Sequence, residues 1–368
     1  MIHVGDIIAK GPHEGSLAVL EYMATHNVTG VRGNHDQQVI EWRGWIDWIS
    51  SIPGGKAWLE RVERKWQKAR EKQDFNSISW VETEGSACSL EDKKWWKRIP
   101  KGWVLFSDHY KIAKDMSETQ FEYLLHLPLR LYTPSAHAYI VHAGLLPSNP
   151  RYSFEDIKKQ PLARVPSLPQ RPIADEIGEV SHSVSSSTKA NKTIERLRNL
   201  QEMSLLTQIP QNTDPWVVLN MRSVVGVKIS RKPKKGVPWT KFWNQHMNSC
   251  SGFKQTLAEV RDANGNVDFN TTLRLSCYPS TTIYGHAASR GLVVKRWSFG
   301  LDSGCVYRRK LSALVIGKVP VKANWNQGDE REDTSDEVRD NVDTLKQNYD
   351  SLPFGDRGVA SIIHVRCL

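Results

Sequence analysis

The sequence lacks any apolar run that approaches the roughly 20 residues of a membrane span. It also lacks the basic region and apolar segment of a secretory signal, because Met1 is followed closely by His3, Gly5 and Asp6. No internal repeat is visible. We therefore expect a chain that is neither anchored in a membrane nor secreted.

The sequence contains few cysteines, and their spacing indicates no pairs. The five cysteines are odd in number and include no C-x-x-C pair, which excludes a zinc-finger cage and gives no sign of a disulfide framework. We expect buried free thiols at Cys88, Cys250, Cys277, Cys305 and Cys367.

Acidic side chains are fewer than basic ones, 40 against 50, which leaves a net charge of +10. Such a surplus favours a polyanionic partner, namely nucleic acid, anionic lipid or a phosphate-rich substrate. No helix-turn-helix, zinc-finger or RNA-binding signature accompanies the charge, so we do not expect nucleic acid. With 39% hydrophobic residues in 368, the chain can bury a full core in one large domain or two ordinary ones.

Several short apolar runs end in polar turns. Strands are expected at 2–4, 28–31, 138–141, 281–284 and 291–297, and a helix at 14–25 lies between the first two. Strand, helix and strand in this order form a βαβ unit, and ligands of such sheets bind beyond the carboxyl ends of the strands.

The remaining segments carry weaker signals. Residues 42–103 hold nine of the 14 tryptophans and predict helices packed over the core, with an aromatic substrate wall as the alternative. Residues 151–199 are rich in Pro, Ser and Lys and predict an insertion loop. Residues 228–241 contain six basic and no acidic side chains. They form either a solvated loop or a basic surface that binds a phosphate chain beside the active site, and both interpretations stay open. Residues 318–368 predict a polar, acidic tail, with about 329–343 at the periphery.

Carboxylate, amide and imidazole groups stand at the ends of the expected strands. They belong to Asp6, Asn34, His142 and His286, with His35 beside the amide. These ligand types suit Zn, Mn, Fe or Co, and the neighbouring glycines let the backbone turn sharply so that the side chains converge. Each residue alone is a weak signal, whereas the four together indicate a metal centre.

The order of these motifs resembles the calcineurin-like metallophosphoesterases, in their phosphoprotein-phosphatase branch. The matching stretches are GDIIAKGP at 5–12, RGNHD at 32–36, HAGL at 142–145 and YGHA at 284–287. The KGP ending is similar to the diadenosine-tetraphosphatase-like subgroup, and LDSGCVY at 301–307 resembles the fungal vacuolar zinc-dependent endopolyphosphatases within it. The resemblance covers most of a domain at 1–317 and implies an α/β sandwich of two mixed β-sheets flanked by helices.

The resemblance also implies roles for individual residues. Asp6 would bridge two divalent ions (Zn, Mn, Co or Fe), and the second ion would be bound by Asn34, His142 and His286. His35 would be the general acid or a phosphate ligand at the transition state. Lys10 stands where the family usually has an arginine that holds phosphate, Arg32 would support the Asn34 turn or bind phosphate, and Asp302 would be a partner behind the ligands.

The sequence departs from the family pattern before Asp6 and at Ala9, and also at Arg308 and Arg309, where relatives tend to have glycine. A Gly-Asp-x-His-Gly motif should precede Asp6 by about one strand-helix-strand unit. We expect that the sequence is an N-terminally truncated form of a longer enzyme, with an incomplete first metal site and a sheet without its first strand-helix unit. Ala9 occupies the position where the family often has an aspartate that orients the catalytic histidine.

The expected function is metal-dependent hydrolysis of phosphoanhydride bonds in inorganic polyphosphate. Two ions would activate water and hold the phosphoryl oxygens, and the basic surplus would steer a long polyanion. Alternatives within the enzyme class are a dinucleoside-polyphosphate hydrolase and a Ser/Thr protein phosphatase. A different class is a catalytically impaired protein that binds a polyanion or a partner. The resemblance suggests the vacuole, with the cytoplasm as the alternative.

Overall fold

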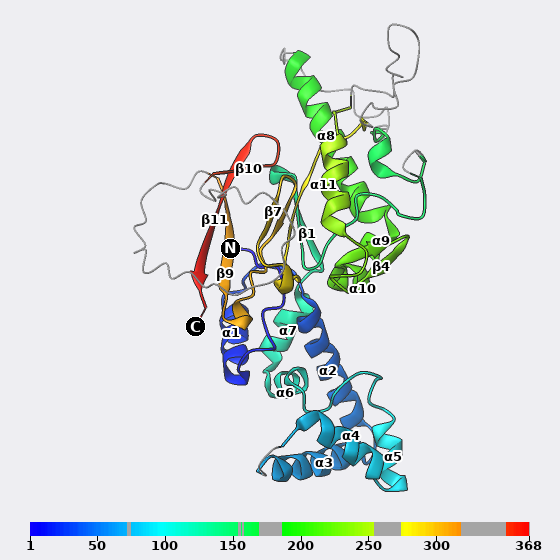
Figure 1. Cartoon of the computed structure of the whole chain (residues 1–368), viewed down its shortest axis with the longest axis vertical. Helices are drawn as coiled ribbons and strands as arrows, with labels where there is room; N and C mark the ends of the chain where they lie inside the picture. The colour runs from blue at the N-terminus through cyan, green and yellow to red at the C-terminus, as the bar shows by residue number, and fades with distance from the viewer. Residues whose placement is uncertain are drawn as a thin grey trace, which may run out of the picture.

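The computed structural model describes residues 1–71, 75–153, 156, 158–168, 186–253, 274–317 and 351–367 of the chain, and side chains in all of these except 186–190. Figure 1 shows two sheets beside each other, a group of helices against one of them, and a separate helical group that extends away from both.

The central sheet has the strand order β1-β2-β6-β8-β7. Its middle strands β2 (Ala138–Val141), β6 (Thr281–Tyr284) and β8 (Ser298–Gly300) are parallel, so their carboxyl ends reach the same edge. The outer strands β1 (Arg130–Thr133) and β7 (Val293–Lys295) pair antiparallel to β2 and β8. The strand expected at 291–297 is present as β7 but covers only 293–295, because the chain then reverses into β8.

The second sheet contains β9 (Lys310–Ile316), β10 (Leu352–Phe354) and β11 (Gly358–Arg366), all antiparallel in the order β10-β11-β9. The prediction of a polar, acidic tail at 318–368 is wrong for 351–367, because β11 pairs with β9 and buries Ala360 and Ile362. Residues 318–350 of that expected tail lie outside the described residues.

Side chains of β2 alternate between two cores. Tyr139 and Val141 pack with the helical side of the central sheet, whereas Ala138 and Ile140 join Phe354 and other residues between the two sheets. This alternation is the expected consequence of the two-residue repeat of a strand. The predicted fold class, an α/β arrangement of two β-sheets flanked by helices, is confirmed.

The helices on the central sheet are α8 (Ser186–Thr207), α9 (Pro210–Thr213), α10 (Pro215–Asn220) and α11 (Trp239–Ser249) (Figure 1). The prediction of an insertion loop at 151–199 is wrong from 186 onward, because α8 begins there. This helix buries Arg198, Gln201 and Glu202. Residues 169–185 of that segment lie outside the described residues.

The basic segment at 228–241 folds into a small antiparallel sheet. Strand β3 (Ser223–Val225) pairs with β4 (Lys228–Ser230) and with β5 (Val237–Pro238), and α11 begins directly after β5. Short 3-10 turns occur at η1 (Pro134–Ala136), η2 (Pro161–Ala163), η4 (Ala288–Arg290) and η5 (Cys305–Tyr307).

The tryptophan-rich segment forms helices, as predicted. Helices α1 (His13–Thr25), α2 (Asn34–Ser51), α6 (Asp108–Asp115) and α7 (Glu118–His126) pack together, and α3 (Gly55–Arg70), α4 (Ser77–Ala87) and α5 (Leu90–Trp96) gather at the far end of α2 (Figure 1). Trp42, Trp58, Trp66 and Trp95 are buried in one cluster, which confirms the interpretation as core packing.

The first two expected strands are reduced to a single parallel bridge. His3 and Gly30 form that bridge, supported by backbone bonds from the His3 amide to Thr29 and from the Val31 amide to His3. The predicted helix between them is present as α1.

Two disulfides contradict the expectation of free thiols. Cys250 pairs with Cys277, and Cys305 pairs with Cys367, so Cys88 is the free cysteine among the described residues. The partners are 27 and 62 residues apart in sequence, and tertiary structure alone brings them together. No helix in the described part of the chain is long and apolar enough to cross a membrane.

Candidate metal centre

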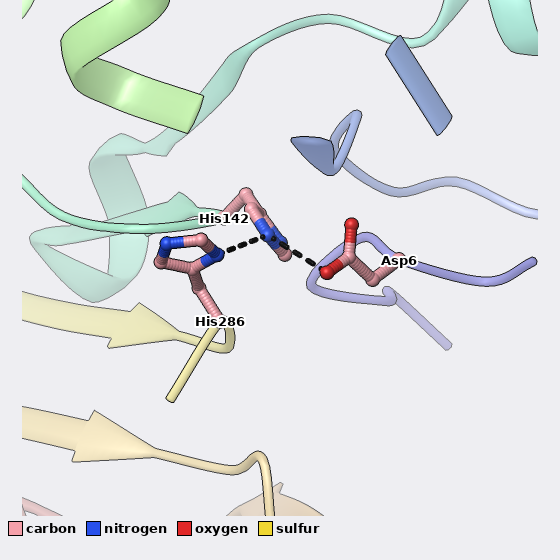
Figure 2. A group of neighbouring side chains, drawn as sticks. All are labelled: Asp6, His142 and His286. Carbon is pink, nitrogen blue, oxygen red and sulfur yellow. Dashed lines mark hydrogen bonds and ion pairs between the residues drawn. The ribbon is translucent and has the colours of Figure 1, made fainter. Parts of the chain in front are cut away.

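Two parallel strand ends, one turn and one helix start meet at the carboxyl edge of the central sheet. His142 follows β2, His286 follows β6, Asp6 lies in the turn before α1, and Asn34 is the first residue of α2. Figure 2 shows the side chains of Asp6 and His286 on either side of His142. The structure thus brings together the side chains that the sequence marked as metal ligands.

The donor atoms of these residues are within coordination range of one another. His142 Nε2 lies 3.0 Å from His286 Nδ1, 3.1 Å from Asn34 Oδ1 and 3.2 Å from Asp6 Oδ2. One ligand atom from each of Asp6, His142 and His286 lies within 4.8 Å of the others, the one such group found among the described residues.

The outward nitrogens of both histidines are bonded to backbone carbonyls. His142 Nδ1 donates to Val4 O at 2.8 Å, and His286 Nε2 donates to Asn220 O at 3.2 Å. With these protons in place, the inward nitrogens carry lone pairs that face each other and two side-chain oxygens. Neutral histidines with this backbone support are typical metal ligands, so the donor set fits a divalent cation.

The pKa values of the ligands reflect this crowding of acceptors. Although burial disfavours a charged ring, the Asp6 carboxylate raises the pKa of His142. Burial lowers the pKa of His286 well below its usual value, which keeps that ring neutral. Burial alone would raise the pKa of Asp6, but His142 and the His35 amide lower it below its usual range. The Asp6 carboxylate therefore favours a positive charge beside it, whereas the His286 ring stays neutral.

Asp36 connects the two turns that carry the oxygen ligands. Its fully buried carboxylate accepts backbone N–H bonds from Gly33 at 2.8 Å, Asp6 at 2.9 Å and Ile7 at 3.1 Å. Burial, with the nearby charge of Asp6, raises the pKa of Asp36 to about 7, while the N–H bonds oppose that shift. A Cβ atom at Gly33 would lie 2.2 Å from Asp6 Oδ1, so the approach of the two turns requires glycine there.

Two of the candidate ligands have backbone conformations that residues other than glycine rarely adopt. Asp6 has a φ of 53° and His286 a φ of 62°, both in the left-handed region. Such strain is common at functional sites, where the surrounding structure holds it in place. Here hydrogen bonds to Asp36 and Arg222 fix the two turns.

His35 lies beside the ligands. Its amide donates to Asp6 Oδ1 at 2.8 Å, and its Nδ1 atom lies 2.8 Å from His109 Nε2. Burial lowers the pKa of His35, while the charge of Asp6 opposes that shift and Lys10 adds to it. Lys10 is thus within electrostatic reach of the predicted acid. His109 was not predicted from the sequence.

Arg222 is a second residue of the site that was not predicted from the sequence. It lies between α10 and β3, is partly buried, and donates from Nε and Nη2 to His286 O at 3.1 and 2.9 Å. Burial lowers its pKa, and the charge of Asp6 partly restores it. A lone arginine after the apolar stretch of α10 carries no motif, so no local signal marks it.

The other two predicted residues have different surroundings. Arg32 donates to Gln37 Oε1 at 2.9 Å and to Leu125 O, so its guanidinium is bonded to α2 and to the end of α7. A phosphate role for Arg32 stays a prediction. Burial raises the pKa of Asp302, whose Oδ1 accepts from the Gly304 amide at 3.3 Å; Asp6 and His142 influence its charge.

Comparison with known proteins adds one family match. Residues 1–143 match the profile of the family described as calcineurin-like phosphoesterase. This segment includes Asp6, Asn34, His35 and His142, but ends before His286.

One solved structure, of a candidate diadenosine tetraphosphatase, is 17% identical to the chain, with a TM-score of 0.36 over 84% of this chain and 73% of that one. Similarity at that level supports no argument about this protein. No protein of curated function matches the chain.

Proposed function

We propose that this chain, which matches the calcineurin-like phosphoesterase family over residues 1–143, is a metal-dependent phosphohydrolase that cleaves the phosphoanhydride bonds of inorganic polyphosphate. The match to that family supports a hydrolase. The choice of bond and substrate is our proposal, and it depends on the surroundings of the metal centre.

The observation that carries the proposal is a row of positive side chains that begins at the metal centre. We call Arg222, Arg290, Lys295 and Lys241 the cation row. Arg290 donates from Nη1 to Arg222 O at 3.3 Å and from Nη2 to Pro233 O at 3.0 Å. Burial and then the charges of Arg290 and Lys241 lower the pKa of Lys295, so these groups are close enough to repel one another.

Nothing among the described residues neutralises the cation row by direct contact. None of its four members forms an ion pair with a carboxylate in the parts of the chain that the structure describes. Repulsion between unpaired like charges is relieved when an anion with several charges binds. A polyphosphate chain, with about one negative charge per phosphate, meets this requirement better than a single phosphomonoester does.

The residues of the centre have separate roles in the proposed reaction. Asp6, Asn34, His142 and His286 would hold divalent metal, which supplies a more acidic water and neutralises phosphoryl charge. Arg222 would hold a phosphoryl oxygen beside the centre, and His35 would donate a proton to the leaving phosphate oxygen. The resemblance implies two ions, whereas the described residues form one ligand group. We propose about one tightly bound ion per chain.

The experiment compares kcat/KM for long-chain polyphosphate, diadenosine tetraphosphate and a phosphopeptide, with metal content measured on the same sample. We expect the highest value for polyphosphate. The double variant Lys241→Glu and Lys295→Glu should raise KM for long chains about ten-fold, equivalent to about 1.4 kcal/mol, and leave tripolyphosphate little changed.

The matched control is the double variant Lys56→Glu and Lys68→Glu on α3, which makes the same charge change far from the centre (Figure 1). A preference for the dinucleotide or the phosphopeptide would select one of those enzyme classes instead. Salt-sensitive binding of polyphosphate without turnover of any substrate would indicate the binding protein. Two tightly bound ions would contradict the incomplete first site.

A further inference from the structure

His35 and His109 meet between the starts of two packed helices. His35 is the second residue of α2 and His109 the second residue of α6. His35 Nδ1 and His109 Nε2 are 2.8 Å apart, the ring planes differ by 21°, and the ring centroids are 5.0 Å apart. The distance between the centroids is accounted for by the 2.8 Å between the facing nitrogens plus the distance from each nitrogen to the centre of its own ring. The rings are therefore joined end to end and nearly in one plane, as in a direct N–H···N hydrogen bond.

The pair formed by His142 and His286 has a different geometry. Its nitrogens are 3.0 Å apart, but the ring planes differ by 66° and the His142 nitrogen also faces Asp6 and Asn34. Four donor atoms that converge on one region suit a cation, whereas two coplanar rings that face each other suit a shared proton. The geometries of the two histidine pairs therefore suit different functions.

Core packing fixes the position of His109. The next residue, Tyr110, is 1% exposed and packs its ring edge-on against Trp42 of α2, with centroids 5.3 Å apart. Ile112 and Ala113 of α6 are also buried, and Arg43 of α2 donates to Met116 O at 3.1 Å, just beyond the end of α6. Because α6 cannot slide along α2 without disrupting this core, the His109 ring is held against His35 before any substrate binds.

His109 is neutral at ordinary pH. Burial, and then the neighbouring His35, lower its pKa to about 4. A neutral imidazole has one N–H group and one lone pair, so it can bond His35 Nδ1 without adding a charge beside the metal centre.

We propose that His109 is the positioning residue of His35: its bond to Nδ1 fixes the ring and leaves Nε2 as the nitrogen that acts on the substrate. This inference rests on the proposed function for its consequence in catalysis. The bond itself is a property of the folded chain and is tested separately.

The first measurement is nuclear magnetic resonance of the metal-free protein with isotope-labelled histidine nitrogens. We expect a scalar coupling between His35 Nδ1 and His109 Nε2 that disappears in His109→Ala. The second measurement is steady-state kinetics. His109→Ala should lower kcat about ten- to hundred-fold and change KM by less than about two-fold. His109→Gln, whose amide can bond Nδ1, should recover part of the loss.

A double-mutant cycle separates positioning from a general loss of structure. In a His35→Ala background, His109→Ala should have an effect of less than about two-fold. The matched control is His13→Ala. His13 bonds Asp115 of α6, the helix that carries His109, at 3.0 Å. Its replacement should leave kcat unchanged.

The outcomes distinguish this inference from the proposed function. Absence of the coupling, a change in KM alone, or an equal loss of kcat in the His35→Ala background would overturn the role of His109. If the wild-type protein hydrolyses no phosphate substrate, the proposed function fails, and the coupling still decides whether His109 holds His35.

Discussion

Asp36 shows how one buried carboxylate organises a centre that it does not face. It accepts three backbone N–H bonds from two turns that are about thirty residues apart in sequence, and those turns carry Asp6 and Asn34. The carboxylate provides two oxygen atoms with lone pairs for all three donors, which no neutral side chain of similar size does.

Replacing Asp36 by asparagine should therefore destabilise the protein. The amide of Asp36→Asn has one acceptor oxygen, and its NH2 group would face an N–H donor, so at least one buried donor loses its partner. We expect a decrease of about 2 kcal/mol in the free energy of unfolding and about ten-fold weaker metal binding, measured by urea denaturation and calorimetry.

The control for Asp36→Asn lies on the same helix. Asp47 is 62% exposed and pairs with Arg43 one turn away, so Asp47→Asn should change the unfolding free energy by less than about 0.5 kcal/mol. Equal effects of the two substitutions would mean that the buried carboxylate does not hold the turns.

At the scale of elements, a buried polar network joins α8 to the edge of the central sheet opposite the metal centre. Glu202 is completely buried and accepts from Ser280 Oγ at 2.9 Å, from Tyr132 Oη and from Arg198 Nε at 3.3 Å, with His137 Nδ1 at 3.1 Å. Arg198 also bonds Asp356 between β10 and β11. The Glu202 carboxylate thus connects α8 directly to the central sheet and, through Arg198, to the second sheet.

Glu202→Ala should be strongly destabilising, because it leaves Arg198 buried without one of its carboxylates. We expect a loss of about 3–5 kcal/mol in urea denaturation. Glu195→Ala, at an exposed position of the same helix, should cost less than about 0.5 kcal/mol. A loss below about 1 kcal/mol for Glu202→Ala would show that α8 is held by its apolar contacts alone.

The sequence predicts those parts of the centre that depend on local patterns. Asp6, Asn34, His142 and His286 each follow or begin an element beside a glycine or a polar turn, so their meeting follows from parallel strands. His109 and Arg222 depend on packing between elements: His109 reaches His35 across 74 residues through the contact of α6 with α2. Ala9 cannot hold His35, and no sequence pattern indicates that His109 does.

The fold, like the metal centre, has some features that local sequence patterns predict and others that depend on contacts between distant residues. Alternating and apolar runs predict β2, β6 and the helices, because each pattern reports burial along one element. The strand β11 and both disulfides depend on register instead. Pairing of Arg366 with Lys310 brings Cys367 beside the turn that holds Cys305, which spacing alone does not reveal.

At the scale of the whole molecule, the disulfides indicate where the chain functions. Cross-links of this kind persist in oxidising compartments and are rare in a reduced cytosol. We propose that the protein works outside the cytoplasm, and the vacuole suggested by the resemblance is our choice of compartment.

Chemical labelling of the protein isolated from cells tests this proposal. After denaturation without reductant, a thiol reagent should modify Cys88 alone, as mass spectrometry would show. Reduction should lower the unfolding free energy by about 2–4 kcal/mol per disulfide, and Cys88→Ser should leave it unchanged. Labelling of Cys305 and Cys367 in that sample would contradict both the cross-link and the compartment.

Helix α2 has a mechanical consequence. Its first turn carries Asn34 and His35, and its 18 residues extend about 27 Å, at about 1.5 Å per residue, to the group formed by α3, α4 and α5 (Figure 1). Trp45 of α2 donates to Arg98 O at 2.9 Å, which fastens that group to the helix. The helix therefore acts as a lever: a tilt imposed at its remote end would move a candidate metal ligand and the proposed acid together, as one rigid piece.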